Sequence, residues 1–207
     1  MDYKVLFIRF ISSLILICIV FPLIIFYNES LLYILLFFYL IIFYEIKNYF
    51  SYKKKLIYSY IILSLLSSVI YLIYFINIYF LIFLLITIIL FDTYSYILGS
   101  LFGIKKILPT ISPNKTYFGL ISGYIFTIIS LYFINTYFIL NYSFIKFFVV
   151  SNIIIFFAIT GDLIESFFKR KSNIKDSGNL IPGHGGFFDR LDSYLSTSFF
   201  LPISIFL

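Results

Sequence analysis

The sequence contains few charged residues. Asp, Glu, Lys and Arg make up only 12% of its 207 residues, whereas about a quarter of an ordinary soluble domain is charged. Apolar residues account for 62% of the chain, and the mean hydropathy is +1.08. This composition excludes a water-soluble globule and a disordered chain. It is typical of an all-α polytopic membrane protein.

Cysteine and histidine are almost absent as well. The single cysteine, Cys18, has no partner for an intrachain disulfide, which excludes a secreted disulfide scaffold. We interpret it as a small packing residue. His184 is the only histidine. A zinc site, which is usually built from several Cys and His ligands, is therefore not expected.

Seven apolar segments follow one another along the chain and predict about seven transmembrane helices. Pro22 is expected to kink the end of the first, which membranes tolerate. Since a full crossing needs roughly 20 residues, the second, fourth and seventh segments are short. The segments are residues 5–26, 31–44, 56–75, 78–90, 117–134, 144–159 and 193–207.

The lysines and arginines are clustered between the apolar segments. If the N-terminus is placed in the cytoplasm, fourteen of the fifteen basic residues lie on the cytoplasmic side, and only Lys146 lies outside. This positive-inside bias predicts the topology, and it accounts for the net charge of +6 without a nucleic-acid partner. Two long polar segments, residues 99–116 and 161–192, then face the cytoplasm, where we expect the chemistry.

The second polar segment carries five of the nine acidic residues. A helix that continues through Asp162 would bring Glu165 to the same face. Asp189 and Asp192 are likewise three residues apart, where the last helix is expected to begin. Carboxylates from two helix ends can hold Mg²⁺, which prefers oxygen ligands and often binds through one or two carboxylates together with substrate phosphates.

Cations and a glycine-rich stretch accompany these carboxylates. Arg binds phosphate as a planar fork and Lys as a point charge. Residues 181–186, Ile-Pro-Gly-His-Gly-Gly, would let backbone N–H groups approach a phosphate closely. These features predict a phosphoryl or nucleotidyl transfer site. The alternative is a solvated loop that carries only the topology signal, but that signal needs bases alone. The basic residues are Lys169, Arg170, Lys171, Lys175 and Arg190.

The first polar segment and its border offer fewer candidates. Asp92 closes the apolar segment 78–90, and we interpret it either as a helix terminus that reaches water or as a metal or nucleotide contact. Ser112-Pro-Asn-Lys-Thr is predicted to form a turn. In that turn Ser112, Lys115 and Thr116 can offer hydroxyls and a cation to phosphate.

An ungapped run of motifs extends from residue 161 to residue 192. Its parts are Gly161-Asp-Leu-Ile-Glu165, Ser166-Phe-Phe-Lys-Arg170, Lys175-Asp-Ser-Gly178, Pro182-Gly-His-Gly-Gly186 and Asp189-Arg-Leu-Asp192. The run resembles the signature of the phosphatidate cytidylyltransferases, also called CDP-diacylglycerol synthases. The motifs around Asp92 and Lys115 resemble that family in the same order, so the resemblance covers about half of the chain. Tyr94 and Phe118 depart from the family's usual pattern.

The resemblance implies an integral membrane enzyme of phospholipid biosynthesis that joins CTP and phosphatidic acid to give CDP-diacylglycerol and pyrophosphate. It implies dependence on Mg²⁺, often with a second cation such as K⁺, and a homodimer. The expected location is the inner membrane of a bacterial cell, with the active site at the cytoplasmic face. Residues 1–91 would then be N-terminal transmembrane helices, and residues 92–207 the catalytic membrane domain.

This reaction assigns roles to the candidate residues. The predicted metal ligands are Asp162, Asp189 and Asp192, with Asp176 as a further ligand or directly behind the ligands. His184 is predicted to orient a phosphate, the alternative being a structural role. Asp162, Asp176, Asp189 and His184 are therefore the predicted catalytic residues. The predicted substrate-binding residues are Ser112, Lys115, Thr116, Ser166, Lys169, Arg170, Lys175 and Arg190.

Two other classes of protein compete with this interpretation. A lipid kinase or a CDP-alcohol phosphotransferase would share the membrane, the metal and the phosphates, but the D-G-x-x-A-R run of the latter is absent. A transporter or channel would need polar residues in several spans, whereas the first three apolar segments are almost purely apolar.

Overall fold

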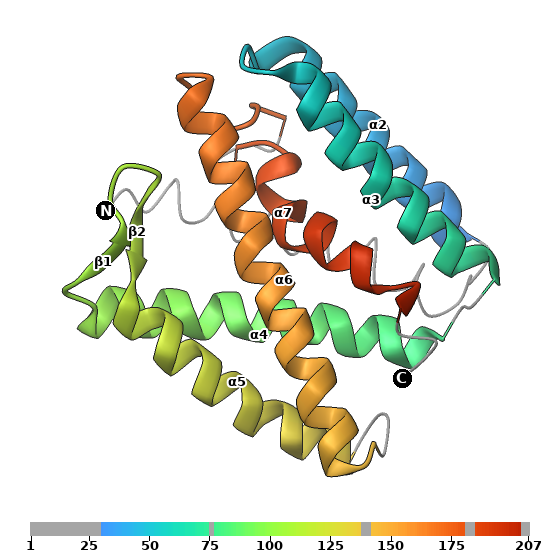
Figure 1. The fold of residues 1–207 in the computed structure, drawn as a ribbon, viewed down its shortest axis with the longest axis vertical. Helices are drawn as coiled ribbons and strands as arrows, with labels where there is room; N and C mark the ends of the chain where they lie inside the picture. Colours follow the sequence, from blue (N-terminus) through green and yellow to red (C-terminus); the bar gives the residue numbers. More distant parts are fainter. Residues whose placement is uncertain (1–29, 75–76, 138–141, 181–184, 204–207) are drawn as a thin grey trace.

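The computed structural model describes residues 30–74, 77–137, 142–180 and 185–203, most of them in helices (Figure 1). A two-stranded hairpin is the only sheet in these ranges. The helices are α2 (Ser30–Tyr49), α3 (Lys54–Tyr74), α4 (Ile78–Phe102), α5 (Tyr117–Tyr137), α6 (Phe144–Lys171), α7 (Phe188–Thr197) and the 3₁₀ helix η1 (Ser198–Phe200). The strands are β1 (Lys106–Leu108) and β2 (Ser112–Thr116).

Five of the described helices, α2 to α6, are long and apolar enough to cross a membrane. This confirms an all-α polytopic membrane protein that carries one short hairpin. The expected first crossing, residues 5–26, lies outside the described residues. In its described part the expected seventh segment is not one long helix, because α7 has ten residues and η1 three. The count of about seven crossings therefore stays a prediction.

Two helices are longer than the apolar segments that predicted them. α4 continues ten residues past Asp92, so this residue is not the helix terminus that was one of its two interpretations. α6 extends to Lys171 and takes in the first third of the polar segment 161–192. The physical reason is that each further residue of a formed helix adds a backbone hydrogen bond. A change from apolar to polar side chains therefore does not end it.

The segment that was predicted to be a turn is strand β2. The turn comes just before it, where the Ile111 N–H donates to the Leu108 carbonyl at 3.1 Å. Lys106 pairs with Thr116 and Leu108 with Ser112 in the antiparallel ladder. A two-stranded hairpin consists of edge strands only, so it tolerates a proline inside β2.

Helices α4 and α5 pack closely through small residues. A Cβ atom on Gly119 of α5 would lie 2.9 Å from the Cα of Gly99 on α4 and 2.6 Å from the Ser95 carbonyl oxygen. Small residues let membrane helices approach at backbone distance. Tyr94 adds a hydrogen bond to Ser130 of α5 at 2.9 Å. The departure at Tyr94 therefore lies in this helix contact.

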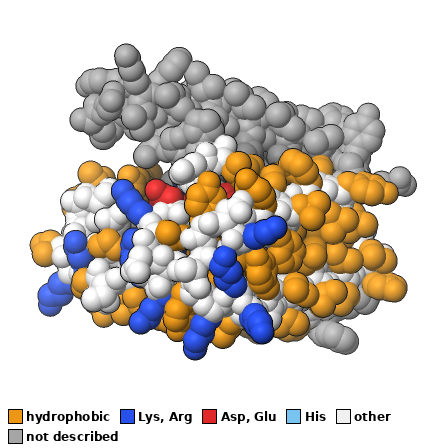
Figure 2. Space-filling view, turned by 90° about the horizontal axis from the view of Figure 1, so that it is seen from above, with side chains coloured by type: hydrophobic (Ala, Val, Ile, Leu, Met, Phe, Trp, Pro, Cys, Tyr) orange, Lys and Arg blue, Asp and Glu red, His pale blue; other side chains and the backbone are white. Residues whose placement is uncertain are grey.

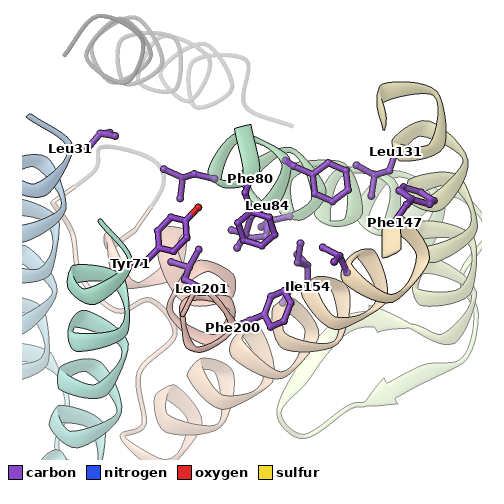
Figure 3. Packing of buried hydrophobic residues seen from close by; sticks show 14 residues of the cluster. Leu31, Tyr71, Phe80, Leu84, Leu131, Phe147, Ile154, Phe200 and Leu201 are labelled. Atoms are coloured by element: carbon purple, nitrogen blue, oxygen red, sulfur yellow. The ribbon is translucent and has the colours of Figure 1, made fainter. Parts of the chain in front are cut away.

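Helix α7 lies between α3 and α6 in the centre of the bundle (Figure 1). One cluster of buried apolar side chains joins the helices from α2 to α6 and η1, and Figure 3 shows Tyr71, Leu84, Ile154 and Phe200 within it. A second cluster joins α2, α3, α6 and α7; its members are Tyr39, Ile42, Ile46, Phe50, Ile57, Ile61, Phe168, Phe188 and Leu195. Tyr194 of α7 packs against both clusters.

Candidate active site

The close contact between α6 and α7 begins at Gly161. A Cβ atom there would overlap the carbonyl oxygen of Asp192 and lie 2.8 Å from the Cβ of Ser196. Only a residue without a side chain lets the two backbones meet at this point. The contact lies directly beside Asp162 on α6 and Asp192 on α7, so it brings two of the predicted metal ligands together from different parts of the chain.

Asp162 forms an ion pair with Lys115 of β2. Ser166, one turn further along α6, donates a hydrogen bond to its other carboxylate oxygen at 3.3 Å. Both members of the ion pair are only partly buried. The structure thus joins the two polar segments of the sequence through one acid and one base, and three of the predicted site residues lie together.

Asp92, Asp162 and Asp192 act on one another electrostatically. Burial, together with the negative charges of Asp162 and Asp92, raises the pKa of Asp192 well above the range of an ordinary aspartate. The positive charge of Lys115 acts on both Asp92 and Asp192. We call Asp92, Asp162 and Asp192 the carboxylate group. Its like charges are only partly compensated by this lysine.

Lys169 and Asp189 belong to a second set of contacts. The Lys169 Nζ lies 2.7 Å from Asp189 Oδ1 and 2.9 Å from Glu165 Oε2. Glu165 is one turn before Lys169 on α6 and is almost completely buried. The prediction that Asp162 and Glu165 lie on one helix face is confirmed. Lys169, predicted to bind phosphate, is engaged by two carboxylates in this structure.

Both oxygens of Asp189 have partners. Oδ1 pairs with Lys169, while Oδ2 accepts the backbone N–H groups of Ser177 and Gly186 at 2.9 and 3.0 Å. Burial alone would raise the pKa of Asp189, but the contacts with Glu165 and Lys169 and the backbone hydrogen bond lower it to about 2. The Gly186 N–H, expected at a phosphate, binds this carboxylate.

Among the described residues, Asp162 and Asp189 do not share a partner, although the sequence suggested that their carboxylates meet at one point. The reason is the start of α7. Asp189 lies in its first turn and turns back to the loop that precedes the helix. Asp192, almost one turn later, is the residue that approaches α6 at Gly161. The metal-ligand role of Asp189 stays a prediction.

Glu45 was missed by the sequence interpretation. It lies in α2, is fully buried, and accepts hydrogen bonds from the backbone N–H groups of Phe187 and Phe188 at 2.8 and 2.9 Å and from Ser177 Oγ at 3.2 Å. A signal was present, because an isolated acid in an apolar transmembrane segment is expensive unless it has partners. Glu45 is the only acidic residue of α2.

The remaining predicted residues are spread over the surface and the hairpin. Arg170 donates hydrogen bonds to the carbonyls of Ile111 and Ile174, so it ties the hairpin to the end of α6. Thr116 accepts the Gly119 N–H at 3.1 Å and caps α5. His184 lies outside the described residues. Ser112 is half-buried on β2, and the exposed members are Lys175, Asp176 and Arg190.

The carboxylate group offers oxygen ligands of the kind that Mg²⁺ prefers. Among the described residues, no group of three or more Asp, Glu, His or Cys side chains is arranged so that it could hold a metal ion by itself. Mg²⁺ does not need such a group, since it keeps several waters and takes one or two carboxylates together with substrate phosphates. The mutual repulsion within the carboxylate group would be relieved by a cation, and Asp162 and Asp192 are the residues that would hold it.

The fold and these contacts define a multi-pass membrane protein with a carboxylate-rich site where α4, α6, α7 and the hairpin meet. The profile of the Cytidylyltransferase family matches residues 55–207. The chain belongs to this family, which confirms the family predicted from the motifs. The match begins after α2, so Glu45 lies outside it.

Curated relatives carry a more specific name. The phosphatidate cytidylyltransferase of Rickettsia typhi is 46% identical over 125 residues, which are 56% of this chain and 54% of the relative. That of Rickettsia bellii is 45% identical over 124 residues, 56% of this chain and 52% of the relative. That of Staphylococcus haemolyticus is 43% identical over 116 residues, 54% and 42%. The chain spans about half the length of the curated relatives it matches.

Proposed function

We propose that the protein is a phosphatidate cytidylyltransferase that transfers the cytidylyl group of CTP to phosphatidic acid, giving CDP-diacylglycerol and pyrophosphate. The observation that carries this proposal is the carboxylate group beside Lys115, at the meeting point of α4, α6 and α7 in a chain of the Cytidylyltransferase family. The names of its relatives support the same activity.

The reaction is a substitution at phosphorus. A phosphate oxygen of phosphatidic acid forms a bond to the α-phosphorus of CTP, and the bond from that phosphorus to the oxygen bridging to the β-phosphorus breaks. The electron pair leaves with pyrophosphate. Because the attacking phosphate is already anionic, no strong general base is needed. The protein's task is to align two polyanions and to stabilise the charge on the leaving group.

Asp162 and Asp192 are proposed to hold Mg²⁺, with Asp92 beside them. When bound, the ion would neutralise phosphate charge and support the leaving pyrophosphate. The ion pair between Lys115 and Asp162 would open, so that the Lys115 ammonium group could contact a substrate phosphate. Ser166 orients the Asp162 carboxylate by its hydrogen bond. A second cation such as K⁺ belongs to the same proposal.

The other cations would act at the rim of this site. Lys175 and Arg190 are exposed and are proposed to meet the phosphates of CTP or of the lipid. Ser112 would contact the nucleotide or the headgroup from the hairpin, whereas the Thr116 hydroxyl, which was predicted to bind substrate, caps α5. Lys169 supports Asp189 in this structure, so its proposed contact with phosphate requires that one of its two ion pairs opens.

The site is proposed to face the cytoplasm. If α2 to α6 cross the membrane in alternating directions, the basic residues of the described ranges all lie on the side where α2, α4 and α6 end. The exception is Lys146 at the start of α6. Figure 2 shows Lys and Arg side chains over the face with the α2–α3 loop and the end of α6, while hydrophobic side chains cover one flank. The positive-inside rule makes this the cytoplasmic face. We also propose location in a bacterial inner membrane and a homodimer.

Release of pyrophosphate tests the function. The purified protein in detergent is given CTP, phosphatidic acid and Mg²⁺, and each is omitted in turn. We expect pyrophosphate and a CDP-lipid product only when all three are present. Pyrophosphate without the lipid would indicate a CTP hydrolase. No release from demonstrably folded protein would contradict the proposal.

A further inference from the structure

Glu45 is a buried charge with a complete set of partners. Its carboxylate receives three hydrogen bonds, and all three come from the segment between α6 and α7 or from the start of α7. Nothing else in α2 contributes a charged side chain to that segment, since the other charged residue, Lys47, is exposed. A carboxylate buried in an apolar helix is retained only where its interactions offset the loss of water.

The start of α7 lacks a cap from its own sequence. The residue at the cap position is Phe187, which has no side chain that can accept a hydrogen bond. The first N–H groups of a helix have no partner within the helix. Glu45 accepts two of them from another helix, and its negative charge also lies at the favourable end of the α7 dipole.

Two glycines on either side of residues 181–184, Gly178 and Gly186, lie close against the same carboxylate. A Cβ atom on Gly178 would lie 2.7 Å from Glu45 Oε1. A Cβ atom on Gly186 would lie 2.7 Å from both carboxylate oxygens. Two glycines of the motif are therefore required for the backbone to approach Glu45. This gives them a function that does not involve a phosphate.

Ser177 connects Glu45 to Asp189. Its hydroxyl donates to Glu45 Oε2 and accepts the Asp189 N–H, both at 3.2 Å, while its own N–H donates to Asp189 Oδ2 at 2.9 Å. Asp189 then pairs with Lys169. A continuous chain of contacts thus runs from α2 through the loop to α6, and α7, which carries Asp192, starts from it.

We propose that Glu45 is a positioning residue for the transfer reaction. It fixes the start of α7 and the glycine-containing loop, and through them the place of Asp189 and Asp192 relative to α6. The inference rests on the proposed function. It assigns to α2, which precedes the part matched by the family profile, a direct share in building the site.

The experiment compares Glu45→Gln with a matched control, Ile42→Ala. Ile42 lies almost one turn before Glu45 on α2, is also fully buried, and packs in the second apolar cluster, so its truncation weakens the packing of α2 but removes none of the hydrogen bonds that Glu45 makes. Glu45→Gln retains one acceptor oxygen but places an NH₂ group against backbone donors. Both proteins are purified in detergent, and kcat, KM and the thermal midpoint Tm are measured with and without Mg²⁺.

We expect Glu45→Gln to lower kcat by about 10- to 100-fold, the range for groups that support a metal ligand, with little change in KM. We also expect the rise in Tm that Mg²⁺ causes in the unaltered protein to be reduced. Ile42→Ala should lower Tm but keep both kcat and the Mg²⁺-induced rise. If Glu45→Gln behaves like Ile42→Ala, Glu45 serves only stability and the inference is overturned.

Ser177→Ala provides a second measurement if Glu45→Gln does not fold. It removes the hydroxyl between Glu45 and Asp189 but leaves the two backbone hydrogen bonds to Glu45 intact. We expect kcat and the Mg²⁺-induced rise in Tm to fall, as in Glu45→Gln, but by smaller amounts. Unchanged kcat in Ser177→Ala would contradict the inference. Absence of pyrophosphate release from the unaltered protein would instead contradict the proposed function. Failure of the proposed function and failure of this inference are therefore distinguishable.

Discussion

The two halves of the site contain the same types of residue but differ in how their charges are satisfied. Around Asp189, each carboxylate oxygen has a partner: a lysine on one side and two backbone N–H groups on the other. In the carboxylate group, the negative charges of Asp162 and Asp92 add to the burial that raises the pKa of Asp192, and Lys115 is paired with Asp162. The first arrangement is complete without a ligand, whereas the second gains from a cation.

This difference indicates that the network around Asp189 supports the structure of the site, while the carboxylate group takes part in the reaction. A satisfied, buried network is rigid and fixes the elements that contribute to it. A cluster of like charges that is only partly compensated is the arrangement that pKa-perturbed functional sites share. We therefore expect changes in the carboxylate group to affect turnover, and changes around Asp189 to affect folding and turnover together.

The largest effect is expected for Asp162→Asn. The amide keeps the size of the side chain and can still accept from Ser166, but it removes a charge from the carboxylate group. Turnover should fall by more than about 100-fold, beyond the range for supporting groups, while Tm in the absence of Mg²⁺ stays unchanged or rises. Near-normal pyrophosphate release would remove Asp162 from the metal site.

Asp189→Asn should reduce both activity and stability. Removal of one partner from a buried ion pair costs about 3–5 kcal/mol because it leaves the other charge uncompensated. Lys169 retains Glu165, so the lower end of this range is expected. Chemical denaturation in detergent and the rate per folded molecule should both show the loss. A protein of normal stability that lost all turnover would instead favour the metal-ligand role predicted for Asp189.

Gly161→Ala tests whether the approach of α7 to α6 builds the carboxylate group. The new methyl group would overlap the Asp192 carbonyl, and overpacking of this kind costs about 1–3 kcal/mol. We expect a lower Tm and a lower kcat. The control is Gly123→Ala, which meets Ser95 in the α4–α5 contact and should lower Tm with less effect on kcat. Equal losses of kcat in both variants would contradict this assignment.

Lys115→Met should raise KM for CTP by about tenfold, which corresponds to a charged hydrogen bond of about 1.5 kcal/mol. The measurement is the initial rate over a range of CTP concentrations. Lys106→Met, on the exposed side of the same hairpin, is the matched control and should leave KM unchanged. If the two variants shift KM equally, Lys115 acts only through the general positive charge of this face.

The smallest effect on activity is expected for Thr116→Ala. The sequence predicted that Thr116 binds substrate, but its hydroxyl caps α5 and packs against Gly99. Loss of such a cap costs about 1 kcal/mol. Tm should therefore fall slightly, with kcat and KM of the folded protein nearly unchanged, and Thr116→Ser should restore Tm. A large rise in KM would return Thr116 to the substrate site.

Much of the site could be predicted from local spacing. Asp162 and Glu165 share a helix face because residues three apart in an α-helix lie on the same side. The motifs around them identified the family correctly. The strand at Ser112 was predicted as a turn because Ser, Pro and Asn are typical turn residues, whereas an edge strand of a hairpin tolerates the proline. Helix ends were placed where polarity changes, but the backbone hydrogen bonds of α4 and α6 continue through that change.

The sequence by itself determined the membrane character, the family and the residue types of the site, because these depend on composition and on motifs within about 30 residues. Only the tertiary structure decided which acids meet. Asp162 lies with Lys115 and Asp192 because Gly161 lets α7 touch α6, while Asp189 is withdrawn by backbone donors. Glu45 joins the site from 132 residues before Ser177. Such contacts depend on how helices pack, which no local pattern records.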